Sequence, residues 1–124
     1  MSTPPEPTQL LIAADRADAM KVLTRDGSSL GSVHTFMVNK RTGQATHAVL
    51  VLGGFLGMGK SYYPLPFELM TYDATADNYR ITIDQKMIEG GPSWSNNTPV
   101  FDQAYSDRVA GYYGVAAQNL SLSY

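Results

Sequence analysis

The stretch LGSVHTFMVNKRTGQATHAVLVL, residues 30–52, decides the fold. Its first part, up to residue 39, and its last part, from residue 45, are rich in β-branched and aromatic residues, as is typical of strands. Turn residues at 40–43 separate the two parts, so we expect a hairpin. In the second strand, Ala48, Leu50 and Leu52 point one way and Val49 and Val51 the other. Apolar residues on both faces indicate that the outside is covered too, by the C-terminal helix, by a second copy of the protein, or by both.

Further short strands flank this hairpin. Strand-forming runs occur at residues 21–24, 61–65, 71–73 and 79–83, with turn chemistry at Asp26-Gly27 and at residues 74–78. This spacing leaves no room for crossover helices between the strands. We therefore expect an all-β fold, a small, six-stranded, mostly antiparallel barrel with short peripheral helices, including a C-terminal helix. The predicted interior consists of Val33, Phe36, Val38, Val49, Val51, Ile81 and Ile83.

Two short helices are predicted after the last strand. Asp84 is placed to cap a turn that runs through Glu89. The second helix is predicted to begin at Thr98-Pro99, a cap followed by a first-turn proline, and to stop at Gly114. Its apolar side repeats every four residues, at Phe101, Tyr105, Val109 and Tyr113. A lone helix of this length is not stable in water, so it must dock on the barrel or on a partner subunit.

Length and composition indicate one domain and exclude several kinds of protein. The chain has 124 residues, a net charge of −2 and no cysteine. We expect a disordered leader at residues 1–9, the barrel at residues 10–91, and a C-terminal loop and helix at residues 92–124. The lack of cysteine excludes disulfides and fits a cytoplasmic location. The basic residues are scattered, which argues against nucleic acid as a partner. No apolar run reaches the roughly 20 residues needed for direct membrane insertion.

The spacing of the turn and core residues resembles a known family. The residues that carry the resemblance are Asp26-Gly27, Leu30-Gly31-Ser32-Val33, Asn39-Lys40-Arg41-Thr42-Gly43, Ala48-Val49-Leu50, Gly53-Gly54-Phe55-Leu56-Gly57-Met58-Gly59, Tyr63-Pro64-Leu65-Pro66-Phe67 and Leu69-Met70-Thr71-Tyr72-Asp73. Over residues 22–83 this pattern resembles the PRC-barrel domain. Gly91-Pro92-Ser93-Trp94 and the tail up to Gly114 resemble a bacterial subgroup of that family.

The resemblance implies a small all-β barrel that acts as a docking module. Members of the family include the cytoplasmic domain of the photosynthetic reaction-centre H subunit and the C-terminal domain of a ribosome maturation factor. This sequence shows neither a transmembrane helix nor a preceding second domain, so we expect it to be neither of these proteins. The family has no catalytic motif, and the resemblance therefore predicts no catalytic residue and no cofactor.

One motif matches a nucleotide-binding pattern whose context contradicts it. Residues 54–61, GFLGMGKS, fit the phosphate-loop pattern G-x-x-x-x-G-K-[ST]. That loop needs a helix to begin at the lysine, so that backbone N–H groups face the phosphates. Pro64 and Pro66 forbid such a helix. We interpret the segment as a glycine-rich connection between two strands.

The titratable residues also favour structural roles. His34 and His47 lie on predicted strands, and no carboxylate stands at a spacing that would complete a metal site. Asp73, Asp77 and Asp84 surround one hairpin and are explained by turn formation and helix capping. We therefore predict no catalytic, cofactor or metal site.

The predicted interaction surface combines the apolar loop with aromatic residues of the C-terminal part. Exposed apolar clusters mark contact surfaces, and aromatic residues are enriched at interfaces. Trp94 either pins its own loop or anchors a partner. The surface consists of Phe55, Leu56, Met58, Trp94, Phe101, Tyr105, Tyr112 and Tyr113. We expect a non-catalytic protein-interaction module, a homodimer with a further, unidentified protein partner. The alternatives are a small-ligand-binding barrel and an accessory protein similar to the reaction-centre H subunit.

Overall fold

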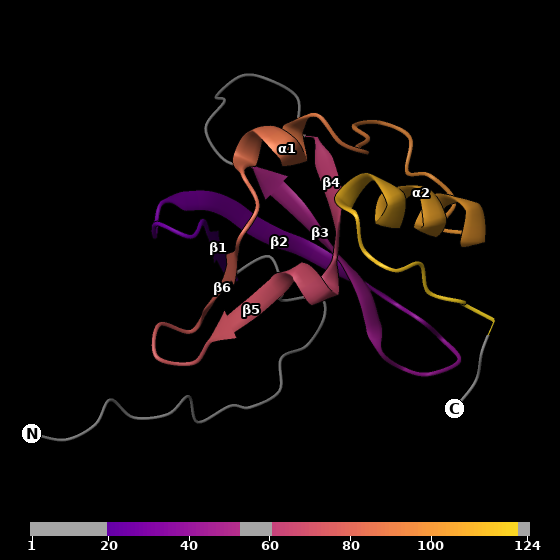
Figure 1. The fold of residues 1–124 in the computed structure, drawn as a ribbon, viewed down its shortest axis with the longest axis horizontal. Helices are drawn as coiled ribbons and strands as arrows, with labels where there is room; N and C mark the ends of the chain where they lie inside the picture. The colour runs from indigo at the N-terminus through magenta and orange to yellow at the C-terminus, as the bar shows by residue number, and fades with distance from the viewer. Residues whose placement is uncertain (1–19, 53–60, 122–124) are drawn as a thin grey trace, which may run out of the picture.

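The computed structural model describes residues 20–52 and 61–121, and it places them in one six-stranded sheet with helices beside it (Figure 1). The strand order is β4-β3-β2-β1-β6-β5. In chain order the elements are β1 (Lys21–Leu23), β2 (Ser29–Val38), β3 (Ala45–Leu52), β4 (Tyr62–Pro66), the 3₁₀ turn η2 (Phe67–Leu69), β5 (Met70–Asp73), β6 (Asn78–Ile81), α1 (Gln85–Glu89) and α2 (Gln103–Tyr113). β1 and β6 are parallel and the other neighbours antiparallel. The sheet curls into a half-barrel, which confirms the predicted mostly antiparallel all-β fold.

β2 and β3 form the hairpin that the sequence predicts. Their register runs from Gly31 opposite Leu52 to Val38 opposite Ala45. The two backbones come close together at Gly31, because a Cβ built there would lie 2.1 Å from the carbonyl oxygen of Val51. A residue with a side chain would push the strands apart, so this position requires glycine.

The core fills the inside of the half-barrel. Its fully buried members include Val22, Val33, Leu50, Leu65, Ile81 and Ile88. Of the other residues predicted to face inward, Phe36 and Ile83 pack against this core, but Val49 and Val51 do not belong to it. The core face of β3 carries Ala48, Leu50 and Leu52, so the predicted orientation of this strand is wrong. The prediction for Val38 is wrong, since this residue is 51% exposed. The register shifts between Met37 and Val38, where β2 enters the turn, and such a bulge disturbs the simple alternation of faces.

Both faces of β3 are covered within the chain itself. Ala48, Val49 and Leu50 are all 0% exposed, although neighbouring residues of a strand point to opposite faces. His47, two residues before Val49 and on the same face, packs against Phe101 from the C-terminal part. The cover that the apolar strand predicts is therefore at least partly intramolecular.

Helix α1 lies across the end of the half-barrel where β3 stops and β4 starts (Figure 1). Its Ile88 is completely buried in the core. Asp84 occupies the N-cap position, as predicted, but its side chain makes no capping hydrogen bond. Packing of Ile88 rather than capping holds this single turn of helix in place.

Strand β4 is an edge of the sheet with few free donors on its outer side. There, Tyr62 exchanges two backbone hydrogen bonds with Trp94, with N···O distances of 2.8 and 3.0 Å. Backbone groups alternate in direction along a strand, so the nitrogens of Pro64 and Pro66 face the same outer side as that of Tyr62. Proline nitrogen carries no hydrogen, and both prolines thus sit where a sheet tolerates them.

Helix α2 packs beside this edge strand (Figure 1). Its N-cap is Asp102, whose side chain accepts a hydrogen bond of 2.9 Å from the backbone N–H of Tyr105. The predicted start at Thr98-Pro99 is therefore wrong, and Phe101 precedes the helix. Gly114 ends the helix with a φ of 71°, as predicted. Within the described residues, neither helix is long and apolar enough to cross a membrane.

Candidate interaction surface

The C-terminal arm, which we define as residues 92–121, is joined to the barrel by a run of aromatic contacts. The rings of Tyr62 and Trp94 stack, with centroids 5.8 Å apart and 28° between their planes. Phe101 meets Trp94 edge-on at 5.7 Å and Tyr105 at 4.8 Å. The guanidinium of Arg108 lies 5.2 Å from the centre of the Tyr105 ring. Trp94 thus pins its loop to the edge of β4, the first of the two roles that the sequence allows.

His47 lies where the arm meets β3. It is only 5% exposed, its Nδ1 is 2.8 Å from the hydroxyl oxygen of Thr46, and its ring meets Phe101 at 5.5 Å. Burial lowers the pKa of His47 from 6.5 to about 4, so the imidazole is neutral at physiological pH. The residue is therefore a buried neutral histidine that packs against the arm, as a strand histidine on a covered face should be.

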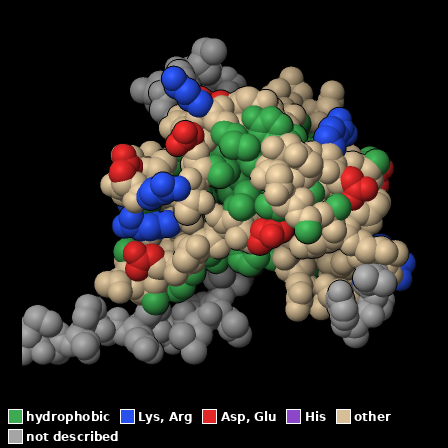
Figure 2. Space-filling view, in the orientation of Figure 1, with side chains coloured by type: hydrophobic (Ala, Val, Ile, Leu, Met, Phe, Trp, Pro, Cys, Tyr) green, Lys and Arg blue, Asp and Glu red, His purple; other side chains and the backbone are tan. Residues whose placement is uncertain are grey.

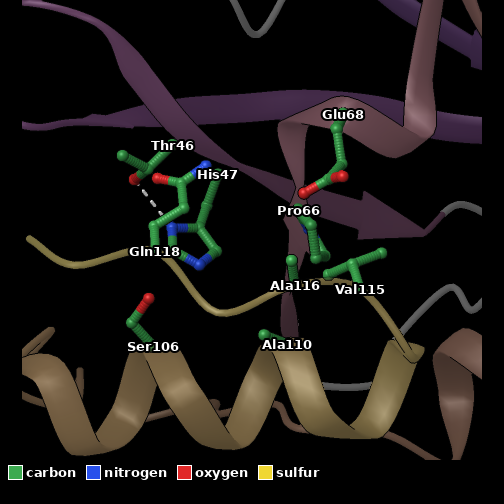
Figure 3. Close-up of a pocket in the computed structure, with 9 residues that line it drawn as sticks. All are labelled: Thr46, His47, Pro66, Glu68, Ser106, Ala110, Val115, Ala116 and Gln118. Atoms are coloured by element: carbon green, nitrogen blue, oxygen red, sulfur yellow. Dashed lines mark hydrogen bonds between the residues drawn. The ribbon is translucent and has the colours of Figure 1, made fainter.

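A small cavity separates the arm from the barrel beside His47 (Figure 3). The barrel contributes Thr46, His47, Pro66 and Glu68, and the arm contributes Ser106, Ala110, Val115, Ala116 and Gln118. Its volume is about 10 Å³, which is room for roughly one water molecule. Pockets for small organic ligands are typically about 300–1,000 Å³, so this cavity is a packing gap at a seam.

Tyr105 and Tyr113 belong to the interface between arm and barrel. Each is 7% exposed, and both are part of the core cluster. Neither hydroxyl has a hydrogen-bond partner among the described residues. Burial raises the pKa of both phenols, which stay protonated. Two residues predicted for an intermolecular surface thus make their apolar contacts inside the chain.

Tyr112 marks the outer surface of the same seam. Its ring lies against Gly91, and its hydroxyl donates a hydrogen bond of 2.6 Å to the carbonyl of Met87. Tyr112 is 38% and Met87 37% exposed, and apolar side chains gather over α1 and the adjoining end of α2 (Figure 2). We call Met87 and Tyr112 the α1–α2 patch. Sequence reasoning selected Tyr112 but missed Met87, because nothing in a five-residue helix shows which residue stays outside.

The apolar loop residues Phe55, Leu56 and Met58 lie outside the described residues. So does most of the phosphate-loop pattern, of which only Ser61 is described. The chain after Ser61 forms strand β4, Tyr62–Pro66. A phosphate loop requires a helix at this place, and strand β4 does not have that geometry.

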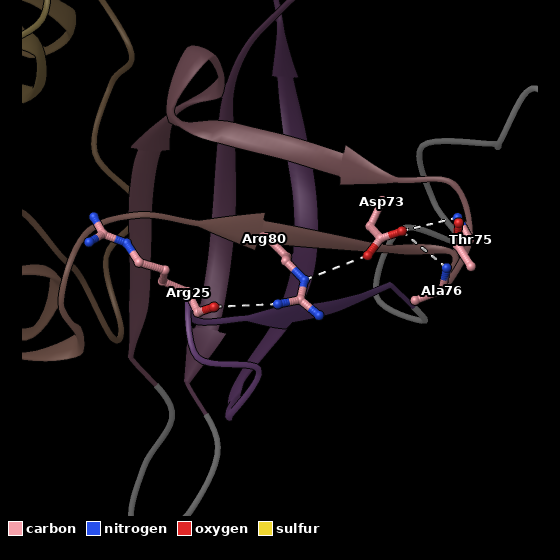
Figure 4. Close-up of polar contacts among 5 residues, drawn as sticks. All are labelled: Arg25, Asp73, Thr75, Ala76 and Arg80. Carbon is pink, nitrogen blue, oxygen red and sulfur yellow. Dashed lines mark hydrogen bonds and ion pairs between the residues drawn. The ribbon is translucent and has the colours of Figure 1, made fainter.

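Asp73, one of the three predicted turn aspartates, belongs to a polar network that ties two turns together (Figure 4). Asp73 accepts hydrogen bonds from the N–H groups of Thr75 and Ala76, at 3.0 and 3.2 Å, and lies 3.6 Å from Arg80 Nε. Arg80 donates to the carbonyl of Arg25 at 3.4 Å, and Arg25 donates to the carbonyl of Thr82 at 3.1 Å. These contacts confirm the structural interpretation of Asp73. The described residues contain no cluster of three or more potential ligands that could hold a metal ion.

The fold and this surface together define a class of protein: a small β half-barrel whose interior is packed and whose C-terminal arm is docked through aromatic residues. A family model for the PRC-barrel domain matches residues 12–88, which is more than half of the chain. The chain belongs to the PRC-barrel domain family. A search of curated proteins found no match. Helix α2 and the connection before it lie beyond the matched residues.

Proposed function

We propose that this PRC-barrel protein is a non-catalytic protein-interaction module that associates with itself. The observation that carries the proposal is the α1–α2 patch: the side chains of Met87 and Tyr112 are each more than one-third exposed, and the hydroxyl of Tyr112 is bonded to the backbone carbonyl of Met87. Exposed apolar surface tends to mark a contact site. Aromatic residues and methionine are enriched in such contacts. With no cysteine to oxidise, the chain suits a reducing compartment, and we place it in the cytoplasm.

The proposal is tested by measuring molar mass over a range of concentrations, with light scattering after size exclusion and with native mass spectrometry. We expect a dimer that dissociates on dilution. The variant Met87→Gln keeps the size of the side chain but removes apolar surface, and it should weaken the dimer at least tenfold.

The matched control is Val38→Gln. Val38 is also exposed and apolar, but it lies at the end of β2 that leads into the turn to β3, whereas α1 lies at the other end of this hairpin, where β3 stops at Leu52 (Figure 1). The control variant should leave the dissociation constant unchanged. A strict monomer at all concentrations, or equal effects of the two variants, would contradict a role of the patch in self-association.

A further inference from the structure

Four aromatic side chains from four elements gather on one side of the half-barrel, and we call them the aromatic face: Phe36 of β2, Phe67 of η2, Tyr72 of β5 and Tyr79 of β6. The first two and Tyr79 meet edge-on in all three pairs, with ring centroids 5.6, 6.3 and 6.2 Å apart. Tyr72 meets Tyr79 at 5.5 Å. Tyr72 is 41% exposed, and the other three are only partly buried. The face therefore joins four large rings, none of which is fully covered.

The two helices do not cover this face. Both α1 and α2 pack on β4, and β1 and β6 lie on the side of the half-barrel away from α2 (Figure 1). The rings of Trp94 and Phe101 in the arm contact Tyr62 and His47 instead. Among the residues that the structure describes, the rings of the aromatic face make aromatic contacts only with one another. A further cover has to come from outside those residues.

The chain enters the described part beside the aromatic face. Met20 packs against the core, and its carbonyl accepts a hydrogen bond of 3.0 Å from the N–H of Val33. Because β1 is antiparallel to β2, its N-terminal end points along β2 toward Phe36, about 10 Å beyond Val33 at 3.3 Å per residue. On the other side β1 is parallel to β6, with Val22 opposite Tyr79. The preceding segment is thus attached between the two strands that carry Phe36 and Tyr79.

Strand β2 also has an unpaired stretch at this place. It has ten residues, whereas β1 has three and pairs with β2 only from Ser29 to Ser32, followed by the bond to Val33. Beyond Val33, no described strand pairs with the side of β2 that faces β1. An open strand edge next to apolar rings is a surface that folded proteins usually cover.

We propose that the aromatic face is the docking site of this chain's own segment Leu10-Leu11-Ile12. Residues 1–19 lie outside the described residues, and this run is the only one among them with three consecutive large apolar side chains. The family match begins at residue 12, so the PRC-barrel domain includes residues before β1. Ile12 stands eight positions before Met20, and that length of extended chain reaches up to about 28 Å. The segment can therefore reach Phe36 and still turn back over the face.

Tethering decides between this segment and other occupants. A short flexible connection holds a segment near its site at an effective concentration on the order of millimolar. A second copy or another protein reaches that concentration only in very concentrated solution. The chain's own apolar run therefore occupies the face first. This inference goes beyond the proposed self-association and does not depend on it.

Spin labelling is the first test, since the chain has no cysteine of its own. A nitroxide on Thr8→Cys, two residues before the apolar run, should broaden the ring proton NMR signals of Phe36, Phe67 and Tyr79. The matched control carries the same label in a chain in which all three residues 10–12 are replaced by serine. It should recover at least half of the lost signal intensity.

A mixed sample identifies which chain supplies the segment. It combines spin-labelled chains that carry no isotope with isotope-labelled chains that carry no spin label. Docking within one chain predicts no broadening of the aromatic face in this mixture. Broadening in the mixture would assign the face to a second copy and overturn the proposal. Unbroadened rings in the singly labelled chain would overturn it as well.

A double-mutant cycle is the second test, because only residues in contact give non-additive effects. Leu11→Ala should lower the folding equilibrium constant at least fivefold in the wild type but less than twofold in Phe67→Ala. Tyr72→Ala, which removes a partly exposed ring, repeats the cycle at a smaller loss of stability. The control background is Val100→Ala, because Val100 is 78% exposed and lies in the arm. Leu11→Ala should keep its full effect there. Equal effects in all backgrounds would overturn docking on the aromatic face.

The outcomes separate this inference from the proposed function. A dimer whose aromatic face is not broadened by the Thr8 label keeps self-association and overturns the docked segment. A strict monomer with broadened rings and a non-additive cycle supports the docked segment and overturns self-association.

Discussion

The ring of Tyr112 covers Gly91 so closely that a Cβ at this glycine would lie 2.6 Å from Cε2 of the tyrosine. The first turn after α1 and the last turn of α2 are therefore packed through a position that holds only a hydrogen atom. This contact, with the hydrogen bond to Met87, fixes the end of the arm against the barrel.

The variant Gly91→Ala should be destabilised by about 1–3 kcal/mol, because the methyl group overpacks the contact with Tyr112. Urea unfolding gives this value. The matched control is Gly111→Ala, since nothing lies within 4 Å of a Cβ there and the residue is inside α2. It should gain about 0.5–1 kcal/mol, because alanine favours the helix. An unchanged free energy of unfolding in Gly91→Ala would show that Tyr112 can shift away from residue 91 without loss of stability.

Stability should fall as the pH drops from about 6.5 to about 4. Burial holds the pKa of folded His47 near 4, whereas the histidine of the unfolded chain binds a proton below about 6.5. The unfolded state therefore takes up more protons in this window, and the loss is at most about 3 kcal/mol. Urea unfolding at several pH values measures it. His47→Gln should abolish this pH dependence, and the control His34→Gln should keep it. If the stability of His47→Gln depended on pH as that of the wild type does, His47 would not be its source.

Removing the hydroxyl of Tyr113 should not harm the protein. Tyr113→Phe deletes a buried group that has no partner among the described residues, so stability should stay the same or rise by up to about 1 kcal/mol. Tyr112→Phe is the matched control, because it breaks the bond to the Met87 carbonyl and should cost about 1 kcal/mol. Trp94, the only tryptophan, reports unfolding by fluorescence. A clear loss of stability in Tyr113→Phe would mean that the Tyr113 hydroxyl has a hydrogen-bond partner.

Asp102 should matter as the N-cap of α2, and Thr98 should not. Asp102→Ala removes the acceptor for the N–H of Tyr105 and should cost about 1 kcal/mol of unfolding free energy. Thr98→Ala should be neutral within about 0.5 kcal/mol, because Thr98 is exposed and precedes the helix by several residues. Chemical denaturation of the two variants compares them directly. A larger loss of stability in Thr98→Ala than in Asp102→Ala would instead support a helix that begins at Thr98-Pro99, as the sequence alone predicts.

The strands and the apolar side of the last helix could be predicted because each follows from local periodicity. Tyr105, Val109 and Tyr113 are buried as their four-residue spacing indicates. The exposure of Val38 could not be predicted, since it depends on a register shift between two strands. The start of α2 was also missed. Thr98 and Asp102 can both cap a helix, and they stand four residues apart. The structure uses Asp102, so Phe101 precedes the helix and packs on Trp94 and His47.

The sequence predicts which aromatic residues make contacts, but not whether those contacts lie within the chain or with a partner. Aromatic side chains serve a domain seam as well as an interface, and the sequence does not say which neighbour they meet. The structure places Tyr105 and Tyr113 at a seam within the chain and leaves Tyr112 partly exposed. Met87 enters the patch only because Tyr112 folds back onto α1, a contact between residues 25 positions apart.

The two prolines of β4 limit how copies of this protein can join. An exposed strand edge can recruit the backbone of another chain, and repeated addition of that kind builds fibrils. With the nitrogens of Pro64 and Pro66 turned outward, this border offers an incoming strand no amide hydrogen at two alternate residues. Growth of the sheet stops there, and a finite assembly built from side chains is the form of association that remains at this edge.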